Sequence, residues 1–238
     1  KQWVSDKCVW TRDECLGEPT PYDEYWPSRS SYFGICDLAG LPKDRYYLHR
    51  SRWQKEDHTI HLLPHWNWGL SKKYQGNSIG KVTPVYCYTD SPTAELFLNG
   101  KSQGKITKNP QERLDRYRLR WNNVKYEPGE LKVIVYDAEG RQAGEQILRT
   151  AGKPAALKLD VWTQWGNRIQ ASGDDLAFIT VSLTDADGNL IPDAADQLSF
   201  EVTGAGTFEA VCNGDATSLE PFKQPTMKLF TGQLVVIV

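Results

Sequence analysis

The chain has little of several features that would mark a particular class of protein. Its 238 residues include 5 cysteines and 4 histidines. Cysteines so few and so irregularly spaced do not form the disulfide framework of a small secreted domain. No apolar run approaches the roughly 20 residues of a membrane-spanning helix. The opening residues KQWV lack the charged and then apolar regions of a signal peptide.

An excess of charge of one sign is also absent. The 28 lysines and arginines nearly balance the 30 acidic residues, for a net charge of −2, and they are scattered along the sequence. Nucleic acids and anionic membranes are bound by clustered basic residues, so we expect neither as a partner. Aromatic residues are plentiful, with 9 Trp and 11 Tyr. Packing in a core is their simpler role, and stacking on the apolar face of a sugar is the more specific one.

Residues 1–60 do not have the pattern of a self-sufficient domain. A strand is predicted at 4–10, followed by a Pro- and Gly-rich loop at 17–42. Pro42 suits the first turn of a helix, with Asp44 near its N-terminus and arginines near its C-terminus. One strand, one loop and one helix make a single βα unit, which cannot bury both of its faces alone.

Residues 61–150 have the pattern of an immunoglobulin-like β-sandwich, in which short strands alternate with turns. Asn99-Gly100 follows the apolar run at 94–98, and both residues tolerate the positive φ of a tight hairpin. Glu127-Pro128-Gly129 is a second turn. Strands are predicted at 82–88, 94–98, 116–121, 131–136 and 145–150.

Residues 151–238 repeat this pattern after the linker AGKP at 151–154. The run DADGN at 185–189 is predicted to be a hairpin turn, and strands are predicted at 156–161, 176–184, 198–202 and 234–238. An immunoglobulin-like sandwich takes about 100 residues and about seven strands. This segment is shorter, so we expect its last strand to be missing.

Four stretches carry a resemblance to a known family. They are VWTRDECLGEPTPYDEYWPSRSSYFGICDLAGLPKDRYYLHRSRW at 9–53, PHWNW at 64–68, ELFLNGKS at 95–102 and TAGKPA at 150–155. Together they resemble the β-galactosidase-like branch of glycoside hydrolase family 2 along nearly the whole chain. The resemblance implies a mainly β fold: two immunoglobulin-like β-sandwiches, at 61–150 and 151–238, preceded at 1–60 by the last βα unit of a (β/α)8 barrel.

The resemblance also implies part of a sugar pocket. Trp10 matches a family tryptophan at the mouth of the last barrel strand, where it implies stacking on the sugar. Glu14 stands where the family has Asp, which implies hydrogen bonds to sugar hydroxyls or support of the pocket. The C-terminal ends of barrel strands are where active sites lie. Both catalytic glutamates of the family precede this motif, so no catalytic residue is assigned here.

Glu14 and Glu18 are a poor substitute for that catalytic pair. Retaining glycosidases hold two carboxyl groups about 5 Å apart, and a strand-end loop offers no framework to fix such a separation. Solvated or structural carboxylates are the better interpretation.

The chain departs from the family pattern at Asp6, Cys8, Arg12, Asp13, Glu14 and Cys15. The family has Gly-Phe-Asp-Tyr where residues 12–15 stand here, in a strand that is otherwise apolar. Unpaired charges are costly to bury. Either these side chains are exposed to solvent or the segment does not form a barrel strand.

No metal or other cofactor is expected. His58, His61 and His65 have spacings that suit zinc, but they fall in a strand-to-linker stretch where a shared helical face is not expected. The run at 185–189 resembles part of a calcium loop, but its twelfth position, Asp196, is not the required Glu. Ser28, Ser30 and Ser31 lack the GxSxG context of a serine nucleophile.

We therefore interpret the chain as the C-terminal part of a retaining β-galactosidase-like glycoside hydrolase that acts on terminal β-linked sugars. Alone it is expected to be inactive, supplying structural support and part of the substrate pocket. The implied partners are the rest of the barrel and a carbohydrate substrate; an oligomer contact stays open, and the implied location of the parent is periplasmic or secreted. Two alternatives remain: a carbohydrate-binding or adhesion module with Trp162 and Trp165 as its platform, and a decayed or truncated gene product.

Overall fold

The computed structural model describes residues 9–18, 27–68, 78–166 and 168–238. Within these residues the chain is mainly β, as the sequence predicts, with one helix and thirteen strands. The strand expected at 4–10 lies largely outside the described residues, and its described part, Val9 and Trp10, is irregular. No helix among the described residues is long and apolar enough to cross a membrane.

The Cα positions divide into two compact units. One comprises residues 1–43, 158–182 and 194–238, and the other comprises residues 44–157 and 183–193. We refer to them as unit 1 and unit 2 and describe each by itself.

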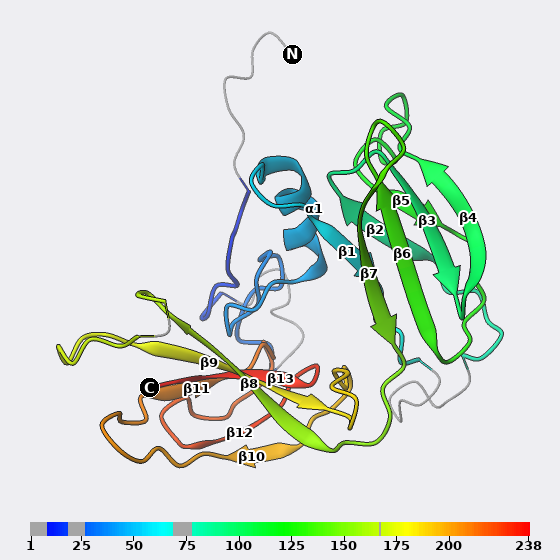
Figure 1. The fold of residues 1–238 in the computed structure, drawn as a ribbon. Coiled ribbons are helices and arrows are strands. Elements are labelled where there is room, and N and C mark those ends of the chain that lie inside the picture. The colour runs from blue at the N-terminus through cyan, green and yellow to red at the C-terminus, as the bar shows by residue number, and fades with distance from the viewer. Residues whose placement is uncertain (1–8, 19–26, 69–77, 167) are drawn as a thin grey trace, which may run out of the picture. The chain divides into compact units, whose positions relative to one another are not determined.

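Unit 2 is built on two antiparallel sheets (Figure 1). The first has the order β1-β2-β5, with β1 at Ile60–Leu63, β2 at Val85–Thr89 and β5 at Leu119–Trp121. The second has the order β4-β3-β6-β7, with β4 at Lys101–Thr107, β3 at Thr93–Leu98, β6 at Glu130–Tyr136 and β7 at Gln142–Arg149.

The core of unit 2 lies between these sheets because buried residues alternate along their strands. Every second residue of β2 and β6 is buried, as the period of a half-buried strand requires. Both sheets contribute to one buried cluster, which includes Leu62, Trp66, Val85, Leu96, Leu119, Tyr126, Leu131 and Val133.

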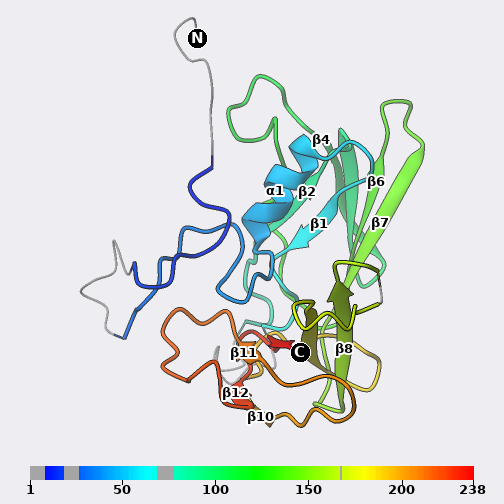
Figure 2. The same cartoon turned by 90° about the vertical axis from the view of Figure 1, so that its left-hand side faces the viewer.

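The helix α1 (Asp44–Trp53) covers β1 and β2 in unit 2 (Figure 2). Asp44 lies in its first turn, and its carboxylate lies 2.7 Å from Nε2 of His61 on β1. One turn further, the Tyr47 ring stacks on the His61 ring, with 3.8 Å between centroids. The predicted helix start near Pro42 is thus fixed by contacts to β1.

Unit 1 contains a four-stranded antiparallel sheet of order β11-β13-β9-β8 and a two-stranded sheet, β10-β12. The strands are β8 at Ala156–Thr163, β9 at Ala177–Thr184, β10 at Gln197–Ser199, β11 at Ala210–Cys212, β12 at Thr226–Lys228 and β13 at Gln233–Ile237. Val211, Met227 and Leu234 are fully buried here. By contrast, seven of the eight residues of β8 are exposed.

Candidate functional site

The candidate site lies in unit 1, where residues 9–18 run beside residues 27–43. Backbone hydrogen bonds of 2.7–3.2 Å join the two stretches: Ile35 N to Thr11 O, Cys36 N to Arg12 O, Ser31 N to Cys15 O and Gly17 N to Arg29 O. The two stretches therefore hold each other without forming a regular strand pair.

Gly34 is required where the two stretches cross. A Cβ atom on Gly34 would lie 2.5 Å from the backbone N of Glu14 and 2.7 Å from the carbonyl O of Cys36. Backbone atoms cannot move aside cheaply, so a larger residue would force the stretches apart. This crossing fixes the position of Glu14.

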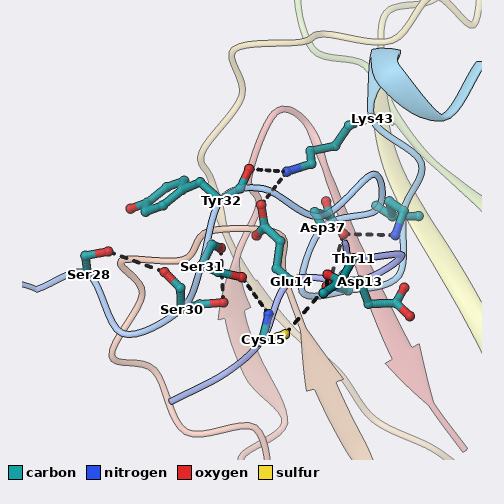
Figure 3. A network of polar contacts seen from close by, with 12 residues as sticks. Thr11, Asp13, Glu14, Cys15, Ser28, Ser30, Ser31, Tyr32, Asp37 and Lys43 are labelled. Atoms are coloured by element: carbon teal, nitrogen blue, oxygen red, sulfur yellow. Dashed lines mark hydrogen bonds and ion pairs between the residues drawn. The ribbon is translucent and has the colours of Figure 1, made fainter. Parts of the chain in front are cut away.

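Glu14 is the central acidic group of the site (Figure 3). Its side chain is 3% exposed, and the Lys43 ammonium forms an ion pair with it. Lys43 also donates to the carbonyl oxygen of Tyr32, 3.0 Å away. Burial raises the pKa of Glu14, and the adjacent Lys43 opposes that rise. The carboxylate of Glu14 thus forms its ion pair within the chain, with Lys43.

Asp37 is a second acidic group of this segment. Its Oδ1 accepts hydrogen bonds of 2.9 Å from the backbone N of Ala39 and of Leu41. Burial raises the pKa of Asp37 to about 6, with a further contribution from the negative charge of Glu14, although these two hydrogen bonds oppose the rise. A Cβ atom on Gly214 would lie 2.0 Å from Oδ2 of Asp37, so the carboxyl group packs directly on the backbone of the sandwich.

The serines of the motif hold the backbone in place. Ser31 Oγ accepts a 2.8 Å hydrogen bond from the backbone N of Cys15. Ser30 and Ser31 are fully buried, and Ser30 Oγ donates to the carbonyl oxygen of Ser31. Their contacts suit a structural role better than a nucleophilic one.

The two predicted sugar-binding residues have opposite environments. Trp10 is 75% exposed, and the peptide bond that follows it is cis. Glu14 is buried and bound to Lys43. An exposed indole is available to stack on a ligand, whereas Glu14 is placed to support the loop. Their roles toward a sugar stay predictions.

Two of the charged departures from the family pattern, Arg12 and Asp13, are exposed, whereas Glu14 is buried; Asp6 and Cys8 lie outside the described residues. The side chains of Arg12 and Asp13 are 79% and 50% exposed and lie 3.7 Å apart. Arg12 and Asp13 thus avoid burial and Glu14 is buried with a partner, and the described part of the segment is not a regular strand.

The three closely spaced histidines have separate partners. His58 contacts Asp90 at 2.8 Å, His61 contacts Asp44, and His65 stacks on Trp68. Over the described residues, no group of three or more His, Cys, Asp and Glu side chains is arranged to hold a metal ion. Residues 185–189 form the predicted turn, in which Asp185 accepts hydrogen bonds from the backbone N of Asp187 and Asn189.

Sequence reasoning missed Lys43 and Asp37 as members of the site. Both lie in the quoted motif, within DLAG and PKD. A buried glutamate must find a cation, and Lys43 is a basic residue in the same motif. The sequence does not show that Glu14 is buried or that the fold brings Lys43 beside it, so this pairing could not be predicted.

Comparisons with known proteins find similarity along nearly the whole chain. Residues 163–238 match the family model described as glycoside hydrolase family 2 C-terminal domain 5, and residues 80–144 match a domain of unknown function, DUF4982. The chain is similar to the β-galactosidase BoGH2A of Bacteroides ovatus, with 43% identity over 99% of this chain and 25% of that protein. It is also 31% identical to a putative β-glucuronidase of Formosa agariphila, over 85% of this chain and 18% of that protein.

A solved structure gives the same result. The crystal structure of a β-glycosidase from Bacteroides vulgatus superposes with a TM-score of 0.76 and 32% identity, covering 89% of this chain and 25% of that one. The chain thus spans about a quarter or less of the length of the proteins it matches. It belongs to glycoside hydrolase family 2, to the C-terminal region of such proteins.

Proposed function

We propose that the chain is the C-terminal part of a retaining β-galactosidase-like glycoside hydrolase that acts on terminal β-linked sugars. The observation that carries this proposal is the 43% identity to a β-galactosidase along 99% of the chain. The matched relatives include both a β-galactosidase and a putative β-glucuronidase, so the family alone does not choose the sugar.

In this proposal the chain contributes support and one wall of the substrate pocket. The Glu14–Lys43 pair and the close crossing at Gly34 fix the loop that carries Trp10. Trp10, with 75% of its surface exposed, supplies an aromatic face for the sugar. The nucleophile and the acid/base carboxylate of the retaining mechanism come from the remainder of the enzyme.

The test compares the full-length protein with the 238-residue chain. Both are assayed with 4-nitrophenyl β-galactoside and 4-nitrophenyl β-glucuronide. We expect saturable hydrolysis of the galactoside by the full-length protein and none above buffer by the chain alone. Proton NMR of the first product should show retention of the β-anomer. Turnover by the isolated chain, or inversion, would contradict the proposal.

Trp10→Ala in the full-length protein tests the pocket wall separately. Loss of the stacking face should lower kcat/KM by roughly tenfold or more, whereas Trp162→Ala should leave kcat/KM within about twofold. Equal effects of the two variants would remove Trp10 from the pocket.

A carbohydrate-binding or adhesion module is the alternative. The observation that favours it is the exposure of Trp162 and Trp165 in unit 1, at 62% and 51%. Trp162 also packs on Phe178, 5.6 Å away between ring centroids, which holds its indole in place. Sugar binding that is lost in Trp162→Ala, by a full-length protein that hydrolyses neither glycoside, would favour this alternative.

A further inference from the structure

An aromatic pocket in unit 2 lies between the C-terminal half of α1 and the loop at 108–118. It has a volume of about 300 Å³ and is lined by Leu48, His49, Arg52, Trp53 and Tyr117. Trp53 is 65% exposed and Tyr117 is 38% exposed. Large exposed aromatic residues that face one pocket are a recognisable mark of a binding surface.

The Trp53 indole stacks on a neighbouring ring. The imidazole of His49, one turn earlier on α1, stacks on it with 4.8 Å between centroids and 28° between planes. Burial and the positive charge of Arg45 lower the pKa of His49, which keeps its ring neutral near pH 7. An exposed aromatic ring face of this kind suits the C–H face of a pyranose.

Two guanidinium groups lie against the Tyr117 ring. Arg52 lies 5.2 Å and Arg116 lies 5.0 Å from its centroid. Among the described residues neither arginine forms an ion pair, although Arg116 Nε donates to the carbonyl oxygen of Arg113. Two positive charges therefore share one ring without a carboxylate to neutralise them.

A neighbouring lysine responds to this positive charge. Lys108 is half-buried, and its pKa is lowered to about 8, first by desolvation and next by the positive charge of Arg52. Guanidinium groups bind carboxylate and sulfate oxygens with paired hydrogen bonds.

We propose that this pocket binds an acidic saccharide, with the sugar ring on Trp53 and its carboxylate or sulfate on Arg52, which lines the pocket, and on Arg116, which lies against the Tyr117 ring outside the lining. The aromatic face accounts for the sugar and the two unpaired guanidinium groups account for its negative charge. Carboxylated and sulfated sugars share this chemistry, and the experiment below distinguishes them.

The experiment uses the full-length protein labelled with 5-fluorotryptophan. The ¹⁹F resonance that is missing in Trp53→Phe identifies Trp53, so binding is observed at this pocket and not elsewhere in the protein. The probes are sodium glucuronate, glucose 6-sulfate and glucose. We expect a saturable shift of the Trp53 resonance with glucuronate or glucose 6-sulfate, and at least tenfold weaker binding of glucose. The acidic probe that binds with the lower Kd shows whether the pocket prefers a carboxylate or a sulfate.

Arg52→Ala and Arg113→Ala form a matched pair, since each removes one arginine from the same surface but Arg113 does not line the pocket. Arg52→Ala should weaken binding of the acidic sugar about tenfold, and Arg113→Ala should change it less than about twofold. The proposal is overturned if the Trp53 resonance does not move, if glucose binds as well as the acidic sugars, or if the two variants weaken binding equally.

Discussion

Glu14 is buried, and among the described residues Lys43 is the cation paired with it, so the loop at 9–18 depends on Lys43. We expect Lys43→Met to lower the free energy of unfolding by about 3 kcal/mol at pH 7, because it leaves a buried charge without a partner. The loss should be smaller at pH 4, where the unpaired carboxyl group takes up a proton. Urea denaturation of the wild type and the variant at both pH values measures this loss in the free energy of unfolding.

Two further variants separate the ion pair from simple truncation. Glu14→Gln combined with Lys43→Met removes both charges, and it should recover most of the lost stability. Lys55→Met removes an exposed lysine that has no ion pair within the described residues, and it should change stability by less than about 0.5 kcal/mol. A double variant as unstable as Lys43→Met would contradict the expected coupling.

Asp37 gives the stability of unit 1 a pH dependence of defined sign. Its pKa is about 6 in the folded protein and about 3.9 in an unfolded chain. Between these values the folded state binds more protons, so the free energy of unfolding falls as pH rises from about 4 to about 6. The contribution of Asp37 is fully present below pH 4 and is lost above pH 6.

Asp37→Asn keeps an acceptor for the backbone N of Ala39 and Leu41 but cannot ionise. We expect this variant to flatten the decline between pH 4 and pH 6, by about 3 kcal/mol at most. Denaturant titrations at three pH values are sufficient. An unchanged slope in Asp37→Asn would show that other groups cause the decline.

The hairpin between β3 and β4 depends on one side chain that joins two turns. Asn99 has φ of 49° and Gly100 has φ of 78°, as a tight Asn-Gly hairpin requires. The Asn99 side chain accepts from the backbone N of Glu130 at 2.8 Å and donates to the carbonyl oxygen of Pro128 at 3.2 Å. It thereby ties this hairpin to the turn before β6.

Asn99→Ala should therefore destabilise unit 2 by about 1–2 kcal/mol, since both hydrogen bonds and the tolerance of positive φ are lost. Asn99→Asp keeps the acceptor for Glu130 N but loses the donor, and it should fall between the wild type and Asn99→Ala. Thermal denaturation followed by circular dichroism ranks the three proteins. A wild-type midpoint for Asn99→Ala would show that the turn does not need this side chain.

Strands with strong local signals could be predicted from the sequence. Alternation of apolar residues located β6, and the Asn-Gly turn located the end of β3. The strand β4 was missed because KSQGKIT is largely exposed and contains a glycine, so it shows no period of two. The strands β11 and β12 are too short, at three residues each, to show a periodicity, and unlike β5 and β10 they do not overlap a longer predicted strand.

The site was predictable only in part, because some of its contacts join residues that are far apart in the sequence. Trp10 and Glu14 were singled out through the motif at 9–53, which is a property of sequence. The contact of Lys43 with Glu14 joins residues 29 positions apart. Such a contact depends on the crossing at Gly34, and nothing local to Lys43 indicates it.

Each of the two units has its own core, and we expect the two cores to respond separately to mutation. Leu96 lies in the core of unit 2 and Met227 is fully buried in unit 1. Truncation to alanine at either position should lower the free energy of unfolding by about 3 kcal/mol. Leu96→Ala should speed hydrogen exchange in β3 and β6 but not in β13, and Met227→Ala should do the reverse. Uniform acceleration in both units would mean that they unfold together.

The bonds of Asn99 also bear on the chemical ageing of the protein. In an Asn-Gly sequence the backbone nitrogen of the glycine attacks the asparagine carboxamide, which deamidates through a cyclic imide. Here both polar atoms of that carboxamide are occupied by Glu130 and Pro128, which holds it away from the attacking nitrogen. Peptide mass spectrometry after prolonged storage should find Asn99 intact in the folded protein and deamidated in the unfolded one. The fraction of Asn99 that is deamidated would therefore report how long the hairpin has been open.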